Sequence, residues 1–352
     1  MPQTLAQKIL QAHTDDVIER DGQIVQCRLS LVLANDITGP LAIKSFKGMG
    51  ASHVFDKDRI ALVMDHFTPQ KDIASANQVM ISRQFAREQG ITHYYEGGDC
   101  GVEHTLLPER GLVGPGDVVI GADSHTCTYG GIGAFATGMG STDIAAGMAL
   151  GETWIKVPPT IRVNINGRMS RWLRGKDLML LLIKTIGVDG ALYKALEFGG
   201  SVIDALPVEG RLTMANMAIE AGGKVGLFAV DELTRQYCAE HGRPGVTMSL
   251  AADEGAAYER VVDIDVTGQE PVVACPHLPS NVKNVSELKD LPVQQVVVGS
   301  CTNGRISDMR DAAEILRGRK VAKGVRCIIL PSTPSVWKQC LKEGLMDVFM
   351  DA

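Results

Sequence analysis

A strand-sized apolar run followed by a segment of helical periodicity recurs along the 352 residues of the chain. Residues 59–66, 91–98 and 117–125 are predicted to be strands, and residues 77–90 and 141–152 to be helices. Strands that alternate with helices form parallel sheets, because each helical crossover returns the chain to the same edge of the sheet. The pattern therefore predicts an α/β fold with mainly parallel strands.

Two proline-containing stretches divide this pattern into three predicted domains. VPP at 157–159 marks the first boundary, and a proline-rich stretch that ends near residue 281 marks the second. The predicted domains are 1–156, 157–281 and 282–352. The second is expected to begin with a hairpin or strand pair that turns near Asn166-Gly167, because Asn-Gly suits a two-residue turn.

The last predicted domain is short for the fold that it begins. It holds two predicted strands, within 294–300 and 325–333, and two predicted helices, within 306–318 and 335–344. These elements cannot cover both faces of a parallel sheet with a core of their own. We therefore expect 282–352 to be the N-terminal part of a longer domain, with the next strand beginning where the chain reaches VFMDA.

Charge and composition exclude several classes of partner. The chain has a formal net charge of −6 and no block of lysine or arginine, so neither nucleic acid nor an anionic membrane surface is expected to bind it. No apolar run is long enough for a membrane span, and the N-terminus lacks the apolar core of a signal peptide, which predicts a cytoplasmic protein. The eight cysteines form no CxxC pair, so reduced thiols are expected.

Reactive side chains follow three predicted strands, at the point where each strand ends. Asp65-His66 follows one strand, Asp123-Ser124-His125 another, and Cys301 a third. Ligands of open α/β sheets bind beyond the carboxyl ends of the strands, so these groups predict one shared site. A glycine-rich stretch, 97–104, adds His104 together with Asp99 and Cys100.

The aspartate–histidine motifs admit both a catalytic and a structural interpretation. A carboxylate beside an imidazole can orient the ring and raise its basicity for general acid catalysis, but an aspartate at a strand end can equally cap the next turn. Ser124 is outside the G-x-S-x-G context of a hydrolase nucleophile.

Residues 131–136 match G-x-G-x-x-A, but the preceding strand ends too early for a dinucleotide site. The glycines are expected instead to let N–H groups approach an anionic substrate near a helix capped by Ser141 or Thr142.

Two further segments carry candidate site residues. Residues 211–223 predict one helix on which Asn216 and Glu220 share a face, where they could hold a substrate and a histidine or could simply face solvent. Cys301 lies in a turn that leads into a helix, where N–H groups favour a thiolate. It could be a nucleophile, a metal ligand or a packed small residue, and the surrounding glycines favour an exposed turn.

The ordered series of these motifs resembles the aconitase family of iron–sulfur hydro-lyases. The series is Asp65-His66, His104, DSHT at 123–126, Asn216 with Glu220, and GSCTNGR at 299–305, and it spans essentially the whole chain. The resemblance implies aconitase-like three-layer α/β/α sandwich domains and a [4Fe–4S] cluster held by three cysteines. Cys301 matches the first of these ligands. The other two belong to a CxxC motif that this chain does not contain, so we expect the cluster to be absent or incomplete here and the chain alone to be inactive.

The resemblance also implies a role for each candidate residue. The residues implied as catalytic are Asp65, His66, His104, Asp123, His125 and Glu220. Those implied as substrate-binding are Ser124, Asn216, Asn303 and Arg305. Within the first set, His66 would protonate the leaving hydroxyl while Asp65 orients it, and the other two histidines would bind and polarise the substrate.

The implied substrate is a 2- or 3-hydroxy di- or tricarboxylate, and the implied partner is a small subunit with a swivelling domain that carries the catalytic base. Chain size favours the interconversion of 2- and 3-isopropylmalate in leucine biosynthesis. Homocitrate is the alternative, since Leu41 stands where many relatives carry a substrate-binding glutamine. Two interpretations of other classes stay open: a zinc hydrolase that uses the same aspartates and histidines, and a non-catalytic scaffold.

Overall fold

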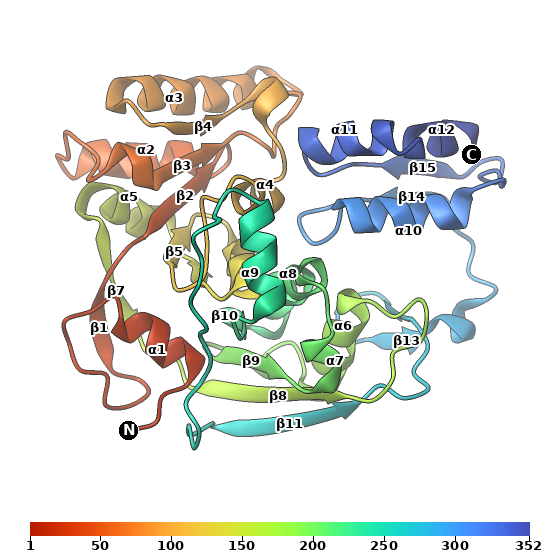
Figure 1. The fold of residues 1–352 in the computed structure, drawn as a ribbon. Helices are drawn as coiled ribbons and strands as arrows, with labels where there is room; N and C mark the ends of the chain where they lie inside the picture. The colour runs from red at the N-terminus through yellow and green to blue at the C-terminus, as the bar shows by residue number, and fades with distance from the viewer.

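The computed structural model describes residues 1–352, and three regions of secondary structure follow one another along the chain (Figure 1). The first contains a five-stranded sheet in the order β4-β3-β2-β5-β6, in which all neighbours are parallel. Its strands are β2 (Leu31–Asn35), β3 (Ile60–Val63), β4 (His93–Tyr95), β5 (Val118–Gly121) and β6 (Phe135–Gly138). The predicted α/β class with mainly parallel strands is confirmed, although the glycine-rich sequence around β6 does not by itself predict a strand.

Alternate side chains of this sheet pack on its opposite faces, and both faces are covered. The elements on one face are α2 (Gly39–Gly48), α3 (Ile73–Gln89) and α5 (Ser141–Leu150), and those on the other are α4 (Glu103–Glu109) and the 3-10 segment η3 (Ser124–Ile132). In β2, Val32 and Ala34 belong to the first core, whereas Leu31 and Leu33 belong to the second. A parallel sheet buried on both faces explains why its strands are apolar throughout.

The ends of two helices test the expected caps. Helix α3 ends at Gly90 with φ of 67°, as its sequence predicts, but it begins four residues before the predicted start at 77. Its cap is Asp72, whose carboxylate accepts the N–H of Ser75 at 2.8 Å. The expected Ser141 or Thr142 cap of α5 is wrong. Gly140 occupies the capping position and supplies no side-chain hydrogen bond, because the helix begins one residue earlier than expected.

The second region holds a four-stranded parallel sheet in the order β10-β9-β8-β11. Its strands are β8 (Thr160–Asn166), β9 (Ala195–Gly199), β10 (Val225–Phe228) and β11 (Arg260–Asp265), and its helices are α6 (Gly175–Ile186), α7 (Ser201–Asp204), α8 (Val208–Asn216) and α9 (Glu232–Glu240). The predicted hairpin near Asn166-Gly167 is wrong, since β8 pairs only with parallel neighbours. The Asn166 side chain instead accepts the N–H of Ser201 at 2.9 Å, at the start of α7.

The predicted single helix over 211–223 is also wrong. Helix α8 ends at Asn216, and a 3-10 turn, η4 (Met217–Ala221), continues the chain to Gly222, where φ is 79°. Asn216 is fully buried, which excludes the solvated-face interpretation for this residue. Glu220 keeps 40% of its side chain exposed.

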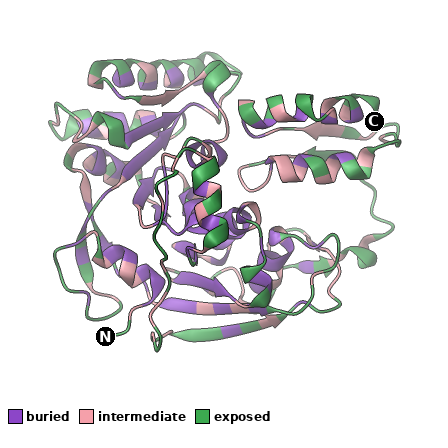
Figure 2. Cartoon of the chain, viewed as in Figure 1, coloured by how far each residue is buried: buried purple, intermediate pink, exposed green.

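The third region is a parallel pair of strands with three helices, and it is far less buried than the two sheets before it (Figure 2). Its elements are β14 (Gln295–Val298), β15 (Arg326–Ile329), α10 (Ile306–Leu316), α11 (Pro334–Lys342) and α12 (Leu345–Asp351). A strand was the expectation for the last residues, and that expectation is wrong. Leu345 and Val348, three residues apart, pack as a helix face against Met309 and Cys340.

Short elements connect these regions. They are α1 (Leu5–Gln11), the antiparallel pair β1 (Ile24–Arg28) with β7 (Glu152–Lys156), and the antiparallel pair β12 (Val272–Ala274) with β13 (Val282–Asn284). The division into three domains remains a proposal, and its second boundary falls between the paired strands β12 and β13. None of the helices combines the length and the hydropathy that crossing a membrane requires.

Candidate active site

Acidic and imidazole groups lie directly beyond the carboxyl ends of the central strands of the first sheet. Asp36 follows β2, Asp65 and His66 follow β3, and Asp123 follows β5. A cavity of about 460 Å³ opens at this edge. The residues that line it are Asp65, His66, Val102, Glu103, His104, Asp123, Ser124, His125 and Cys301. Most of the predicted site residues thus meet at one place, although they come from four separate segments of the chain.

His66 is held in one orientation by the aspartate before it. Its Nδ1 lies 2.7 Å from Oδ1 of Asp65, and its Nε2 lies 3.7 Å from Oδ2 of Asp123, another residue that lines the cavity. Asp36 fixes the backbone of the same turn by accepting the N–H groups of His66 at 3.1 Å and of Phe67 at 2.7 Å. The hydrogen bond to Asp65 raises the pKa of His66, and the burial that opposes this shift is the smaller effect. The pair is arranged to keep a proton available on His66.

A second chain of contacts links the two remaining histidines. Asp123 Oδ1 lies 2.9 Å from His104 Nε2 and accepts the backbone N–H of His125 at 2.7 Å, while His125 Nε2 lies 3.2 Å from Glu220 Oε1. Burial would raise the pKa of Asp123, but the hydrogen bonds from His104 and His125 lower it far below its usual range. Hydrogen bonds to Asp123 and Glu220 raise the pKa of His125 to about 10. His125 is therefore a cation at neutral pH.

Cys301 reaches this cavity from the turn between β14 and α10. The amide of Asn216 holds that turn, since its Oδ1 accepts the Thr302 hydroxyl at 2.7 Å while its Nδ2 donates to Thr128 at 2.8 Å. The buried Asn216 therefore ties the second region to both η3 and the third region. Its observed contacts position Cys301 and do not reach into the cavity.

Two of the residues expected to contact substrate are occupied by the protein itself. Asn303 donates from Nδ2 to Thr213 at 3.1 Å and to Asp308 at 2.9 Å. Arg305 is 3% exposed, and its guanidinium donates to the backbone carbonyls of Thr302 and His104. Neither lines the cavity, so the arrangement described here gives both residues a structural task in holding the turn.

Two glycines of the η3 segment, Gly130 and Gly131, pack closely against other backbone, and the anion site expected near the start of α5 stays a prediction. A Cβ on Gly130 would lie 2.0 Å from the carbonyl oxygen of Gly226, and one on Gly131 would lie 2.6 Å from the nitrogen of Leu212. Only glycine permits this approach between η3 and the second region. These glycines position the DSHT turn at the site by packing.

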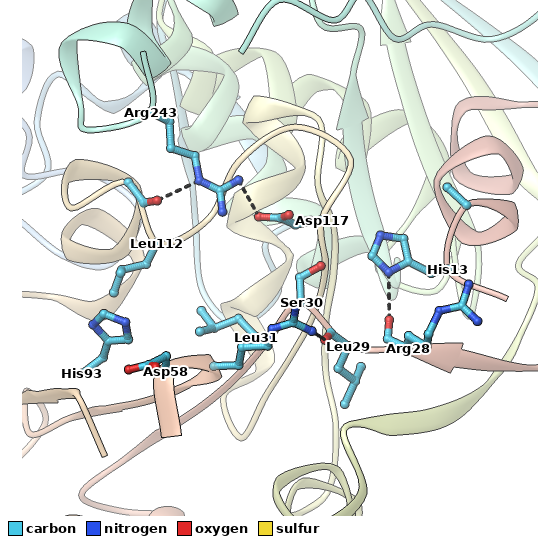
Figure 3. Close-up of a pocket in the computed structure, with 13 residues that line it drawn as sticks. His13, Arg28, Leu29, Ser30, Leu31, Asp58, His93, Leu112, Asp117 and Arg243 are labelled. Atoms are coloured by element: carbon cyan, nitrogen blue, oxygen red, sulfur yellow. Dashed lines mark hydrogen bonds and ion pairs between the residues drawn. The ribbon is translucent and has the colours of Figure 1, made fainter. Parts of the chain in front are cut away.

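A larger cavity than this one lies elsewhere, at the amino ends of the same strands. It has a volume of about 580 Å³, and its charged side chains already have partners (Figure 3). Arg243 lies 2.9 Å from Asp117 and donates to the Gly111 carbonyl at 2.8 Å, while Arg28 pairs with Asp15 at 2.8 Å. This cavity is part of a network of paired charges, and the reactive groups predicted from the sequence lie outside it.

Comparison with known proteins agrees with the geometry of the carboxyl edge. The family model described as Aconitase family (aconitate hydratase) matches residues 7–290 and 281–352. The chain belongs to the aconitase family. Among curated relatives it is 83% identical to a protein of Desulfovibrio desulfuricans, 70% identical to one of Nitratidesulfovibrio vulgaris and 54% identical to one of Acetivibrio thermocellus. Each alignment covers all of this chain and 84% of the relative, and each relative is named 3-isopropylmalate dehydratase large subunit.

Membership of the aconitase family decides between the enzyme classes that the sequence left open. Hydro-lyase chemistry is the activity of the family, so neither a zinc hydrolase nor a non-catalytic scaffold is supported. The structure does contain two groups of side chains that could hold a single metal ion. They are Asp36 with Asp65 and His66, and His66 with Glu103 and Asp123. Neither group is the set of zinc ligands predicted from the sequence, because neither contains His104 or His125. Both of these histidines lie beside Asp123.

The sequence analysis missed three buried polar residues of this aconitase-family site. Glu103 lines the cavity, Asn35 donates to Glu103 at 3.2 Å, and Asp36 supports the His66 turn. A signal for each is present in the sequence. Asn35-Asp36 follows an apolar strand in the same way as Asp65-His66, and Glu103 is the neighbour of His104.

Proposed function

We propose that this chain is the large subunit of a 3-isopropylmalate dehydratase, which interconverts 2-isopropylmalate and 3-isopropylmalate by dehydration and rehydration. The observation that carries the proposal is the joint arrangement of a paired Asp65–His66 and a thiol, Cys301, around one cavity. Full-length similarity to curated relatives of that name supports the substrate.

His66 is the proposed acid for the leaving hydroxyl. Its Nδ1 is held by Asp65 at 2.7 Å and its Nε2 is directed toward the cavity, so a proton on Nε2 can reach a substrate oxygen there. His125 lines the same cavity, and as a cation it can attract a substrate carboxylate, because Asp123 and Glu220 keep it protonated. Ser124 lies beside it, with its hydroxyl 3.2 Å from His125 Nδ1, and is a proposed hydrogen-bond donor to the substrate.

We infer that Cys301 is one ligand of a [4Fe–4S] cluster. The donor set fits one corner of such a group, because Cys301 is the cysteine that lines the cavity and it projects from a turn at the start of a helix. When bound, such a cluster supplies a Lewis acid for the substrate hydroxyl and carboxylate. Cys127 is close by but is not proposed as a ligand, since burial raises the pKa of its thiol to about 12.

A small subunit is the proposed partner, as the name of the relatives implies. We propose that it completes the cavity with the swivelling domain expected from the family and supplies the base that removes the proton from carbon. A cytoplasmic location and a role in leucine biosynthesis are part of the same proposal.

The decisive experiment is an assay of the cluster-loaded complex of the full-length large subunit, which includes the expected CxxC motif, with the small subunit. Isopropylmalate, homocitrate and citrate are offered separately, and kcat/KM is measured for each. We expect isopropylmalate to be preferred. A higher kcat/KM for homocitrate would replace the proposal with a homoaconitase function.

A further inference from the structure

Glu103 is a buried carboxyl group in the wall of the cavity, and part of it has no partner. The residue is 1% exposed, and its Oε1 accepts one hydrogen bond, from Asn35 at 3.2 Å. Its Oε2 is buried without any hydrogen bond. A buried polar atom left without a partner is costly, and Glu103 also lines the cavity, so its carboxyl group is a candidate to contact a ligand there.

The contacts of the neighbouring carboxyl groups show why Glu103 differs from them. Each of the other three accepts two hydrogen bonds: Asp36 from the N–H groups of His66 and Phe67, Asp65 from His66 and the N–H of Glu103, and Asp123 from the N–H of His125 and from His104. These bonds stabilise negative charge. Glu103 has only the weaker donor Asn35, and no lysine or arginine lines the cavity.

The surroundings of Glu103 therefore favour a proton on it. The titratable and charged groups packed around it are Asp36, Asp65, His66, His104, Asp123, Tyr129 and Arg305, and Arg305 directs its guanidinium to backbone carbonyls. Burial, followed by the charges of Asp65 and Asp123, raises the pKa of Glu103 well above its usual range. The proton places a hydroxyl donor in the cavity without adding a negative charge that would repel an anionic substrate.

We propose that Glu103 is a further substrate-contacting residue of this site, a neutral carboxylic acid whose hydroxyl donates a hydrogen bond to the substrate hydroxyl oxygen. A ring nitrogen of His66, a carboxylate oxygen of Glu103 and one of Asp123 lie within 4.8 Å of one another, so one substrate oxygen can contact all three. This inference rests on the proposed hydro-lyase function, because that reaction removes the hydroxyl. Two donors, His66 and Glu103, would then stabilise the oxygen as it leaves.

The proton itself can be tested without any turnover. A difference infrared spectrum between the wild-type chain and Glu103→Gln at neutral pH should contain the carbonyl band of one protonated carboxylic acid. The matched control is Glu109→Gln on the same helix, whose carboxylate accepts from Thr333 outside the cavity. That control should show carboxylate bands only. Absence of an acid band for Glu103 would overturn the proposal.

The role of the proton is tested by kinetics of the cluster-loaded complex. Glu103→Gln should retain more of the wild-type kcat than Glu103→Ala does, because its amide can donate to the cavity while its oxygen still accepts from Asn35. Glu103→Ala should lower kcat about 10²-fold with little change in KM, as expected when one donor to a reacting oxygen is lost. Glu109→Gln should match the wild type.

Three results would contradict this assignment. Full activity of Glu103→Ala would show that the carboxyl does not contact the reacting oxygen. Equal impairment of Glu103→Gln and Glu103→Ala would show that a charged carboxylate is needed, as for a metal ligand. In that case, titration with Mn²⁺ should show metal binding to the wild type and loss of that binding in Glu103→Gln. If the complex did not turn over isopropylmalate at all, the proposed function would fail while the infrared result would still decide the state of Glu103.

Discussion

The five-stranded sheet has a cavity at each of its two edges, and ionisable side chains line both of them. At the amino edge, in the larger cavity, the charged groups are arginines and aspartates that pair with each other, such as Arg243 with Asp117 at 2.9 Å. At the carboxyl edge, carboxylates and imidazoles face one another, His66 Nε2 lies 3.7 Å from Asp123 Oδ2, and Glu103 keeps an oxygen without a partner. Paired charges hold a structure together, whereas unpaired atoms with shifted pKa values are available to a ligand. The difference shows that cavity size alone would select the wrong edge.

The largest effect should come from removing the thiol that faces the carboxyl edge. Cys301→Ser should abolish turnover in the complex, by about 10³-fold or more, because the proposed cluster supplies several kcal/mol of transition-state stabilisation. Visible absorption and kcat are the measurements. Cys327→Ser is the control, since Cys327 is also partly exposed and lies on β15 beside β14. Retention of a cluster and of turnover in Cys301→Ser would remove Cys301 from the site.

The two edges can be compared directly with one kind of substitution. His66→Gln at the carboxyl edge should lower kcat about 10²–10⁴-fold, as expected for loss of a general acid. His93→Gln at the amino edge should leave kcat unchanged, because His93 lines the larger cavity and not the cavity that contains Asp65 and His66. Steady-state kinetics of both variants in the complex give the result. Similar losses in both variants would mean that the edges are not functionally distinct.

A smaller effect concerns the pH at which His66 loses its proton. Asp65→Asn removes the hydrogen bond that is the largest cause of the raised pKa of His66, so the pKa should fall toward its ordinary value. Because the folded pKa is raised, the contribution of this pair to stability is complete below the unfolded pKa, about 6.5, and is lost as the pH rises through the folded value. The alkaline limb of kcat should move to lower pH in the variant. An NMR titration of the imidazole checks the shift, and an unchanged midpoint would contradict it.

The smallest expected effect on activity is at the amino edge. Asp117→Asn leaves the Arg243 guanidinium without its carboxylate, and we expect a loss of about 1–3 kcal/mol in the free energy of unfolding. The rate kcat should not change, because no lining residue of the catalytic cavity contacts Asp117. Urea unfolding and steady-state kinetics are measured on the same preparation. A fall in kcat without a loss of stability would assign a functional role to the larger cavity.

The sequence predicted the α/β class, most strands of the first sheet, and the residues that meet beyond their ends. It did so because parallel strands buried on both faces are apolar throughout and because their reactive residues follow directly at the carboxyl ends. It failed at Asn166-Gly167 and at the break after Asn216, where the side chains are used in contacts with distant segments. Local turn and helix propensity cannot anticipate such contacts.

The sequence by itself therefore determined the strand ends and the kinds of chemistry that stand there. Only the tertiary structure decided which groups are free. Arg305 and Asn303 carry suitable donors, but packing directs most of them to the protein, and the unpaired Nε of Arg305 is buried on a residue that does not line the cavity. Glu103 belongs to no distinctive sequence motif. It becomes a candidate site residue because folding buries it beside three carboxylates and leaves one of its oxygens without a hydrogen bond. Burial and the positions of neighbouring charges set the protonation of such a group, and both are properties of the folded chain.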